Sequence, residues 1–186
     1  METHKKGRLI IVSGPSGVGK GTLVKKLIKK CNNMVLSVSW TTRLPRQGEK
    51  NGVHYYFVPY EEFVDIIKKD GFLEFANYNS NYYGTPNKIV YDQINKGKDV
   101  ILEIDVQGAF KAKKKYSNAI MIFIIPPCVK DLYYRLGKRN TETKEDIEKR
   151  IQRAKDEIEL SSKYDYIIVN DKINKAINEI CDILKC

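Results

Sequence analysis

A glycine-rich turn between an apolar run and an amphipathic segment constrains this chain more than any other feature. The apolar run covers residues 9–12, and the turn reads Gly14-Pro15-Ser16-Gly17-Val18-Gly19-Lys20-Gly21-Thr22. The glycines allow positive φ and a close approach to an anion, so that successive amide N–H groups converge on phosphate oxygens. Apolar residues at helical spacing follow, so a helix dipole would point at the same phosphates. This order of strand, loop and helix predicts a P-loop nucleotide site in which Lys20 lies beside the β- and γ-phosphates.

The loop departs from the strict P-loop pattern at one position. The strict pattern has Ser or Thr directly after the lysine as a magnesium ligand, whereas Gly21 stands there and Thr22 follows. This variant favours kinases of small phosphorylated molecules over motor or transport ATPases. A helix-entry turn without a ligand is the weaker alternative, because a strand and a helix flank the loop in the required order.

Length and composition indicate one globular domain. Of the 186 residues, 42% are hydrophobic and 30% charged, and a chain of this size buries about 70% of the surface that it exposes when unfolded. No apolar stretch approaches about 18 residues, so we expect neither a signal peptide nor a membrane span. A cytoplasmic protein, monomeric and without membrane association, is the expectation.

The cysteines and histidines have no spacing typical of a metal site or a disulfide framework. The chain has four cysteines and two histidines, at Cys31, Cys128, Cys181, Cys186, His4 and His54. We therefore expect free, reduced thiols and no structural zinc.

The net charge of +10 raises the possibility of a nucleic-acid partner, and residues 111–115 form a lysine-rich run. No aromatic residues are interleaved with that run, as stacking on a single strand would require. We interpret it as a solvated helix end and expect no nucleic-acid partner.

The arginines, unlike the scattered lysines, are clustered in the sequence. Of the seven, six fall into two short stretches, at Arg43, Arg46, Arg135, Arg139, Arg150 and Arg153. Because the guanidinium fork makes bidentate contacts with phosphate, these stretches predict phosphate contacts. The pairs at 135/139 and 150/153 each share a helix face, which predicts a closing lid that excludes water. For Arg153 we expect ordinary pairing with a glutamate.

Apolar strands alternate with amphipathic helices along most of the chain. We predict strands over 9–12, 35–39, 100–105, 120–125 and 166–169, and helices over 20–31, 86–96, 107–115, 129–138, 144–162 and 173–184. Between them lie two short strands, 55–58 and 72–75, separated by a helix over 60–69. This pattern predicts an α/β fold with three layers, in which helices cover both faces of a parallel sheet, and one mixed β/α insert.

Two acidic residues follow the apolar run 100–102. Glu103 and Asp105 alternate along the strand and would reach the carboxyl edge of the sheet on one side, where ligands bind in such folds. This position suits residues that hold Mg²⁺ or its waters beside a P-loop. A helix N-cap is the alternative for Asp105.

The segment Ser37-Val38-Ser39-Trp40-Thr41-Thr42-Arg43-Leu44-Pro45-Arg46-Gln47-Gly48-Glu49, taken with the P-loop, resembles the guanylate kinases. The resemblance covers essentially the whole chain and continues through Asn51-Gly52, Tyr55, Phe72-Leu73-Glu74, Asn81-Tyr82-Tyr83-Gly84-Thr85, Ile104-Asp105-Val106-Gln107-Gly108, Arg139-Asn140-Thr141-Glu142 and Val169-Asn170-Asp171. Asn140 replaces the glycine that usually follows the lid arginine.

The resemblance implies a P-loop kinase that phosphorylates GMP with ATP and Mg²⁺ in a single domain over residues 1–186. Its core would comprise residues 8–36, 86–135 and 155–186, its GMP-binding insert residues 37–85 and its lid residues 136–154.

The resemblance also assigns roles to residues. Those implied to bind GMP are Ser39, Arg43, Arg46, Tyr55, Glu74, Tyr83, Thr85, Glu103, Asp105 and Arg150. Those implied to bind ATP are residues 14–22, Arg135, Arg139 and Asn170. Those implied to act in catalysis are Lys20, Arg43, Arg135, Arg139 and Arg150, while Glu103 and Asp105 would hold Mg²⁺ through water.

The chemistry of guanine agrees with these positions. Its N1–H and N2–H donors suit the carboxylates of Glu74 and Asp105, and its O6 acceptor suits the hydroxyls of Ser39 and Thr85. Adenine presents the opposite pattern and would leave buried polar groups unpaired. Two alternatives stay open: a nucleoside monophosphate kinase of other base specificity, and a guanylate-kinase-like module that binds proteins without catalysis.

Overall fold

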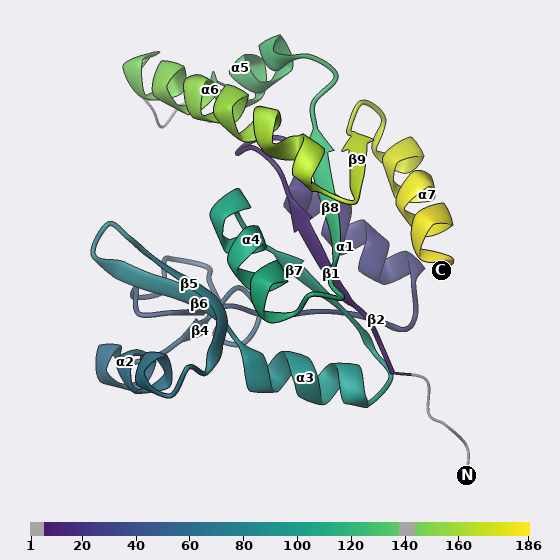
Figure 1. The fold of residues 1–186 in the computed structure, drawn as a ribbon. Coiled ribbons are helices and arrows are strands. Elements are labelled where there is room, and N and C mark those ends of the chain that lie inside the picture. The colour runs from purple at the N-terminus through teal and green to yellow at the C-terminus, as the bar shows by residue number, and fades with distance from the viewer. Residues whose placement is uncertain (1–5, 138–143) are drawn as a thin grey trace. The chain divides into compact units, whose positions relative to one another are not determined.

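A five-stranded sheet and a four-stranded sheet organise the protein, whose computed structural model describes residues 6–137 and 144–186 (Figure 1). The five-stranded sheet has the strand order β2-β7-β1-β8-β9. Its strands are β1 (Leu9–Ser13), β2 (Met34–Leu36), β7 (Asp99–Glu103), β8 (Ile120–Ile125) and β9 (Tyr166–Val169). Consecutive strands of this sheet are joined through helices, so the predicted α/β fold with a parallel sheet is confirmed.

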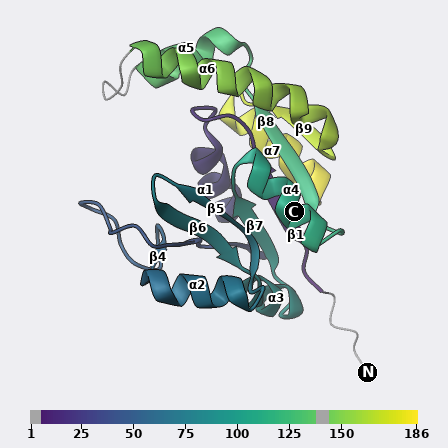
Figure 2. The ribbon, with the colours of Figure 1, turned by 60° about the vertical axis from the view of Figure 1, so that its left-hand side comes forward.

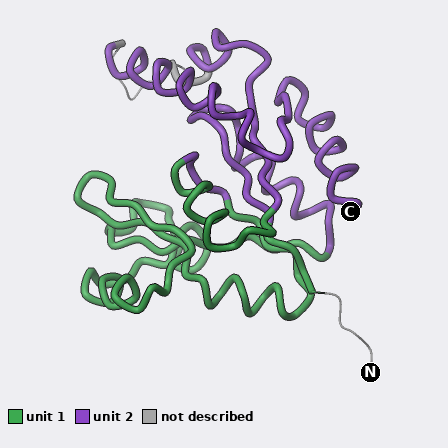
Figure 3. Tube along the Cα trace, in the orientation of Figure 1, with its two compact units in different colours: residues 1–9, 33–102, 107–119 green, residues 10–32, 103–106, 120–186 purple. Residues whose placement is uncertain are grey.

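The chain divides into two compact units, each assembled from separate segments (Figure 3). Unit 1 comprises residues 1–9, 33–102 and 107–119, and unit 2 comprises residues 10–32, 103–106 and 120–186.

Unit 2 contains parallel strands with helices packed around them. β1 pairs with β8 and β8 with β9, and Ile11 opposes Met121 in this register. Its helices are α1 (Lys20–Lys30), α5 (Val129–Gly137), α6 (Lys144–Glu159) and α7 (Ile173–Leu184), with a 3₁₀ turn over Leu160–Lys163. Because β1 and most of β8 are buried, these strands read as continuous apolar runs.

Unit 1 combines the parallel pair β2–β7 with the four-stranded sheet, whose order is β4-β3-β6-β5. The strands of that sheet are β3 (Trp40–Thr41), β4 (Tyr56–Phe57), β5 (Phe72–Tyr78) and β6 (Asn81–Pro86). The helices are α2 (Tyr60–Lys68), α3 (Asn87–Asn95) and α4 (Val106–Lys115). α2 lies against this sheet (Figure 2). The ring of Phe63 on α2 stacks on that of Phe72, with centroids 4.3 Å apart.

Some predicted boundaries are wrong. The strand expected over 35–39 is β2, which ends at Leu36, and the helix expected over 144–162 changes to a 3₁₀ turn after Glu159. The sequence patterns also missed β3 and β6. These strands depend on pairing between distant segments, which local propensity does not encode.

The prediction of free thiols is wrong for two of the four cysteines. Cys31 and Cys186 form a disulfide across 155 residues of sequence, whereas Cys128 and Cys181 are free. The pairing arises because α1 and α7 pack together, a tertiary contact that cysteine spacing does not reveal.

Among the described residues, no helix has the length and apolarity needed to cross a membrane.

The lysine-rich run is more than a solvated helix end. Lys111 Nζ donates to the carbonyl of Phe75 at 2.9 Å, and Lys115 Nζ donates to the carbonyl of Phe72 at 2.6 Å. These lysines thus tie α4 to β5 within unit 1.

Arg8, the arginine outside the two arginine stretches, has a structural role in unit 1. Its backbone N–H donates to Asp99 Oδ1 at 2.8 Å, and its guanidinium donates to both carboxylate oxygens of Asp99. Since Asp99 is buried, these bonds satisfy a carboxylate that would otherwise be desolvated without partners.

We expect Asp99→Asn to lower the free energy of unfolding by about 1–3 kcal/mol, because a charge-assisted fork is replaced by weaker neutral hydrogen bonds. Urea titration checks this value, with Asp65→Asn as the control because Asp65 is exposed. Equal stability of the two variants would contradict a structural role for the ion pair.

Candidate functional site

The glycine-rich turn of unit 2 links β1 to α1. Gly14, Gly17 and Gly19 have φ angles of 142°, 85° and 96°, in the region that favours glycine. A Cβ at Gly14 would lie 2.3 Å from the carbonyl oxygen of Ile124, so the loop passes too close to β8 for a side chain. The loop therefore has the positive φ angles that a phosphate-binding nest requires.

Lys20, the first residue of α1, turns its ammonium group toward this loop. Its Nζ donates to the carbonyls of Gly14 at 2.5 Å and Pro15 at 3.1 Å. Burial lowers the pKa of Lys20, while the charges of Glu103, Glu157 and Asp105 oppose that shift. A partly desolvated ammonium held against the loop is suited to a polyanionic ligand.

The end of β7 brings Glu103 next to Gly21. A Cβ at Gly21 would lie 3.3 Å from Glu103 Oε1, so a serine or threonine there would crowd the carboxylate. Burial raises the pKa of Glu103, and Lys20 and Lys25 act in the opposite direction. Asp105 lies beyond the strand, is exposed, and has an oxygen 4.0 Å from the guanidinium of Arg153.

α6 adds further charged groups to this part of unit 2. Arg150 donates from its guanidinium to Ser16 Oγ in the glycine-rich turn. Arg153 donates to Glu157 Oε1 at 3.0 Å, which confirms its expected pairing with a glutamate. Arg135 lies on α5, and Arg139 lies outside the described residues.

Asn170 follows β9 and supports the loop from behind. Its Nδ2 donates to the carbonyl of Val18 at 2.7 Å, and its backbone N–H donates to Ile125 at 2.8 Å. Because the side chain is buried against the loop, Asn170 holds the shape of the turn.

In unit 1, an arginine and two tyrosines gather with an acid. Arg43 donates to Glu49 Oε1 at 2.9 Å, and its guanidinium carbon lies 5.7 Å from the centroid of the Tyr55 ring. The rings of Tyr55 and Tyr83 meet edge to face with centroids 5.8 Å apart. The hydrogen bonds that the guanidinium donates to Glu49 and to Tyr83 raise the pKa of Arg43, so a permanent cation lies beside these tyrosines.

Ser39 and Arg46 flank this group. Ser39 is half-buried and its carbonyl accepts the backbone N–H of Tyr56 at 2.9 Å. Arg46 is exposed and its backbone N–H donates to Glu49 Oε2 at 2.7 Å. Glu49 therefore binds both ends of the loop that carries Arg43 and Arg46.

Glu74 and Thr85 oppose each other on β5 and β6, next to an irregularity in the strand register. Both are buried, and Thr85 Oγ1 donates to Glu74 Oε1 at 2.7 Å. Burying a carboxylate costs free energy unless it accepts hydrogen bonds, so Glu74 is suited to bind a ligand with hydrogen-bond donors. The Thr85 hydroxyl, which the sequence suggested for guanine O6, thus donates its hydrogen bond to Glu74 and orients the carboxylate.

The predicted site residues thus form two groups. In unit 2, the turn over residues 14–22 lies with Glu103, Arg150 and Asn170. In unit 1, Arg43 lies with Tyr55 and Tyr83, and Glu74 pairs with Thr85.

Sequence reasoning gave no role in the site to two residues of these groups, Glu49 and Glu157. Burial raises the pKa of Glu157, which acts electrostatically on Lys20 from α6. Its position four residues after Arg153 was the available signal. For Glu49, the only signal was an acid three residues after an arginine in an otherwise basic stretch.

Comparison with known proteins gives consistent results. Residues 6–186 match the family model described as Guanylate kinase. A guanylate kinase from Clostridium tetani is 51% identical, with 97% of this chain and 86% of that protein covered. One from Malacoplasma penetrans is 50% identical, with coverages of 98% and 95%. The crystal structure of guanylate kinase from Anaplasma phagocytophilum superposes with a TM-score of 0.77 at 37% identity, with coverages of 97% and 86%.

Proposed function

Because this chain belongs to the guanylate kinase family, we propose that its two groups of polar residues hold the two substrates of one phosphoryl transfer. The enzyme transfers the γ-phosphoryl group of ATP to GMP and forms ADP and GDP. The observation that carries the residue assignment is the buried pair of Glu74 and Thr85, an acid oriented for guanine in a chain that also has a P-loop.

Unit 2 is the donor site in this proposal. The amides of residues 14–22 bind the β- and γ-phosphates of ATP, and Lys20 neutralises the charge that moves during transfer. Arg150, already at Ser16, contacts the phosphates together with Arg135 and Arg139. Asn170 keeps the loop in shape behind the nucleotide.

Unit 1 is the acceptor site. Arg43, Arg46, Tyr55 and Tyr83 hold the GMP phosphate, since a guanidinium and phenolic hydroxyls are strong donors to phosphate oxygens. Ser39 also contacts GMP. Glu74 accepts the N1–H and N2–H of guanine, and this carboxylate is the main source of base selectivity.

The acceptor oxygen of the GMP phosphate is ionised near neutral pH, so the attack on the γ-phosphorus requires no general base. The protein contributes by positioning the two substrates and by neutralising charge in the transition state. Lys20 and the arginines Arg43, Arg135, Arg139 and Arg150 supply that positive charge. No covalent enzyme intermediate is formed.

The residues around Lys20 fit a magnesium ion. Glu103 and Asp105 offer carboxylate oxygens, the ligands that Mg²⁺ prefers, and Gly21 leaves the carboxylate of Glu103 room. Within the described parts of the chain, these acids do not form a cluster of three ligands, so water and the phosphates of ATP would complete the shell. When bound, the ion neutralises phosphate charge during transfer. In this proposal Glu103 and Asp105 also contact GMP.

We further propose which segments of the chain form the GMP-binding insert, the lid and the core. Residues 37–85 form the GMP-binding insert and 136–154 the lid, of which residues 138–143 lie outside the described residues. The core then comprises 8–36, 86–135 and 155–186, in one functional domain over 1–186.

The magnesium requirement is expected to depend on the protonation of Glu103. Since burial raises the pKa of Glu103, protons compete with Mg²⁺ at a higher pH than for an ordinary glutamate. Lowering the pH from about 7 to about 5, toward the range of a raised glutamate pKa, should therefore raise the Mg²⁺ concentration for half-maximal activity more in the wild type than in Glu103→Gln. Titrations of activity with Mg²⁺ at both pH values measure this; an identical pH response of the two proteins would contradict the role of Glu103.

A coupled assay of ADP release with MgATP tests the reaction itself. GMP, AMP, UMP and dTMP are compared as acceptors at equal concentration. Among these four acceptors, we expect rapid ADP release only with GMP. A preference for another acceptor would favour a kinase of other base specificity, and no release with any acceptor would favour the protein-binding module.

A further inference from the structure

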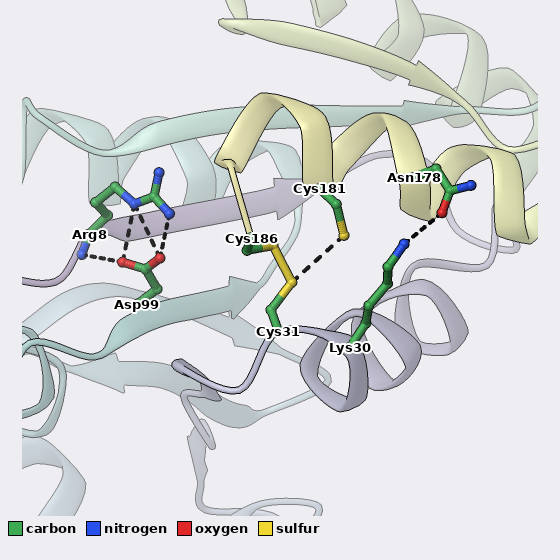
Figure 4. Close-up of a disulfide and its surroundings, with 7 residues drawn as sticks. All are labelled: Arg8, Lys30, Cys31, Asp99, Asn178, Cys181 and Cys186. Atoms are coloured by element: carbon green, nitrogen blue, oxygen red, sulfur yellow. Dashed lines mark hydrogen bonds and ion pairs between the residues drawn. A yellow bond between two sulfur atoms is a disulfide. The ribbon is translucent and has the colours of Figure 1, made fainter.

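Three cysteines of unit 2 have no part in the phosphoryl transfer. Cys31 directly follows α1, Cys181 lies within α7, and Cys186 follows that helix (Figure 4). Their sulfur atoms all lie within 4.8 Å of one another. Cys31 is bonded to Cys186, and the Sγ of Cys181 lies 3.7 Å from the Sγ of Cys31. A third sulfur is therefore next to the disulfide.

The ends of the two helices bring these cysteines together. Lys185 has a left-handed φ of 54°, and the N–H of Cys186 donates to the carbonyl of Cys181 at 3.2 Å, which folds Cys186 back over the end of α7. Nearby, Lys30 Nζ donates to Asn178 Oδ1 at 2.7 Å and joins α1 to α7 (Figure 4). The Cα atoms of Cys31 and Cys186 are 5.4 Å apart, within the usual disulfide range.

The three sulfurs differ in their access to solvent. Cys31 is 3% exposed and Cys181 4% exposed, whereas Cys186 is an exposed residue. A small reagent thus reaches the cluster through Cys186. Thiol–disulfide exchange depends on such access and on a second thiol close enough to attack the same sulfur.

We propose that Cys31, Cys181 and Cys186 form a thiol–disulfide exchange site that fastens α7 to the end of α1 under the control of low-molecular-weight disulfides and thiols. In the reduced protein, the Cys186 thiolate attacks a small disulfide RSSR, forms a mixed disulfide and releases RSH. The Cys31 thiolate then displaces the second RSH and forms the Cys31–Cys186 bond. Two protein thiols are oxidised and one RSSR is reduced to two RSH.

Cys181 gives the site a second closed form. Its thiolate attacks the sulfur of Cys31, the bond to Cys186 breaks, and Cys186 leaves as a thiolate that takes up a proton. This isomerisation involves no net oxidation. It returns a thiol to the exposed position and leaves the disulfide between the two buried sulfurs.

The closed forms should stabilise the protein while leaving the chemistry unchanged. Closing a loop of 155 residues restricts the unfolded chain, so a higher melting temperature is expected. α1 has 11 residues, so the cluster lies about 15 Å along the helix from Lys20, given a rise of about 1.5 Å per residue.

The test uses the full chain with Cys128→Ser, which removes the exposed thiol outside the cluster. The protein is equilibrated with glutathione disulfide or dithiothreitol, quenched with acid and then alkylated, and its disulfides are mapped by mass spectrometry. We expect Cys31–Cys186 as the main bond and Cys31–Cys181 as the minor one. Oxidation should raise the melting temperature by roughly 5–10 °C.

Single variants separate the roles of the three sulfurs. Adding Cys186→Ser should slow oxidation by about tenfold or more and leave only Cys31–Cys181, because the attacking thiols are then buried. Adding Cys181→Ser should leave only Cys31–Cys186. With Cys31→Ser, neither of these two bonds can form, and Cys186 should still be the thiol that reacts first with glutathione disulfide.

Three results would overturn the proposal: no disulfide within the cluster after oxidation, equal melting temperatures of the oxidised and reduced proteins, or Zn²⁺ that copurifies and protects all three thiols from alkylation. Because this assay follows disulfides and melting, it is independent of the kinase reaction. If the proposed assignment of the nucleotide sites failed, the result of this disulfide assay would be unchanged.

Discussion

Replacing Lys20 with methionine will lower kcat by at least about 10²-fold, which corresponds to roughly 3 kcal/mol of lost transition-state stabilisation. The ammonium group lies against the carbonyls of Gly14 and Pro15, at the turn where the β- and γ-phosphates are expected. Methionine is one atom shorter but similarly flexible and removes the charge, so the packing of α1 is retained.

The matched control is Lys26→Met, which removes an exposed lysine from the same helix. We expect this variant to keep the kcat of the wild type. Steady-state kinetics at saturating MgATP and GMP, together with melting temperatures of all three proteins, make the comparison. A Lys20→Met enzyme with kcat within about threefold of the wild type, a loss of less than 1 kcal/mol, would remove Lys20 from the mechanism.

The second large effect concerns base selectivity. Glu74→Gln should lower kcat/KM for GMP by about 10²-fold, chiefly through KM, because a hydrogen bond to a charged acceptor contributes about 1.5–3 kcal/mol. The amide also presents N–H donors where guanine presents its own, so the preference for GMP over AMP should fall by a similar factor. Competition assays with the two nucleotides measure this ratio.

Two further variants locate the effect. Thr85→Val removes the hydrogen bond that orients Glu74 and should shift selectivity in the same direction by about tenfold. Glu62→Gln changes an exposed acid on α2 of the same unit and should have no effect. If Glu74→Gln kept the full preference for GMP, another residue would have to read the base.

The sheet of parallel strands was predictable because burial on both faces leaves a local signature. The runs at 9–12, 100–102 and 120–125 are almost wholly apolar, and each corresponds to a strand of the structure. The glycine-rich turn was predictable for a similar reason, since its conformation depends on a few residues that are adjacent in sequence.

Features that depend on distant partners could not be predicted. β3 is two residues long and exists through its pairing with β4 and β6. From the sequence, Glu49 is expected to be an ordinary surface charge. Its contacts with Arg43 and with the N–H of Arg46 exist only because the loop folds back on itself. The Cys31–Cys186 disulfide depends on the packing of α1 against α7.

The most direct test is a crystal structure with GMP, Mg²⁺ and a non-hydrolysable ATP analogue bound together. We predict the GMP phosphate on Arg43, Arg46, Tyr55 and Tyr83 with guanine on Glu74, and the triphosphate on the amides of residues 14–22 with Lys20. GMP bound away from Arg43 and Arg46 would contradict the account.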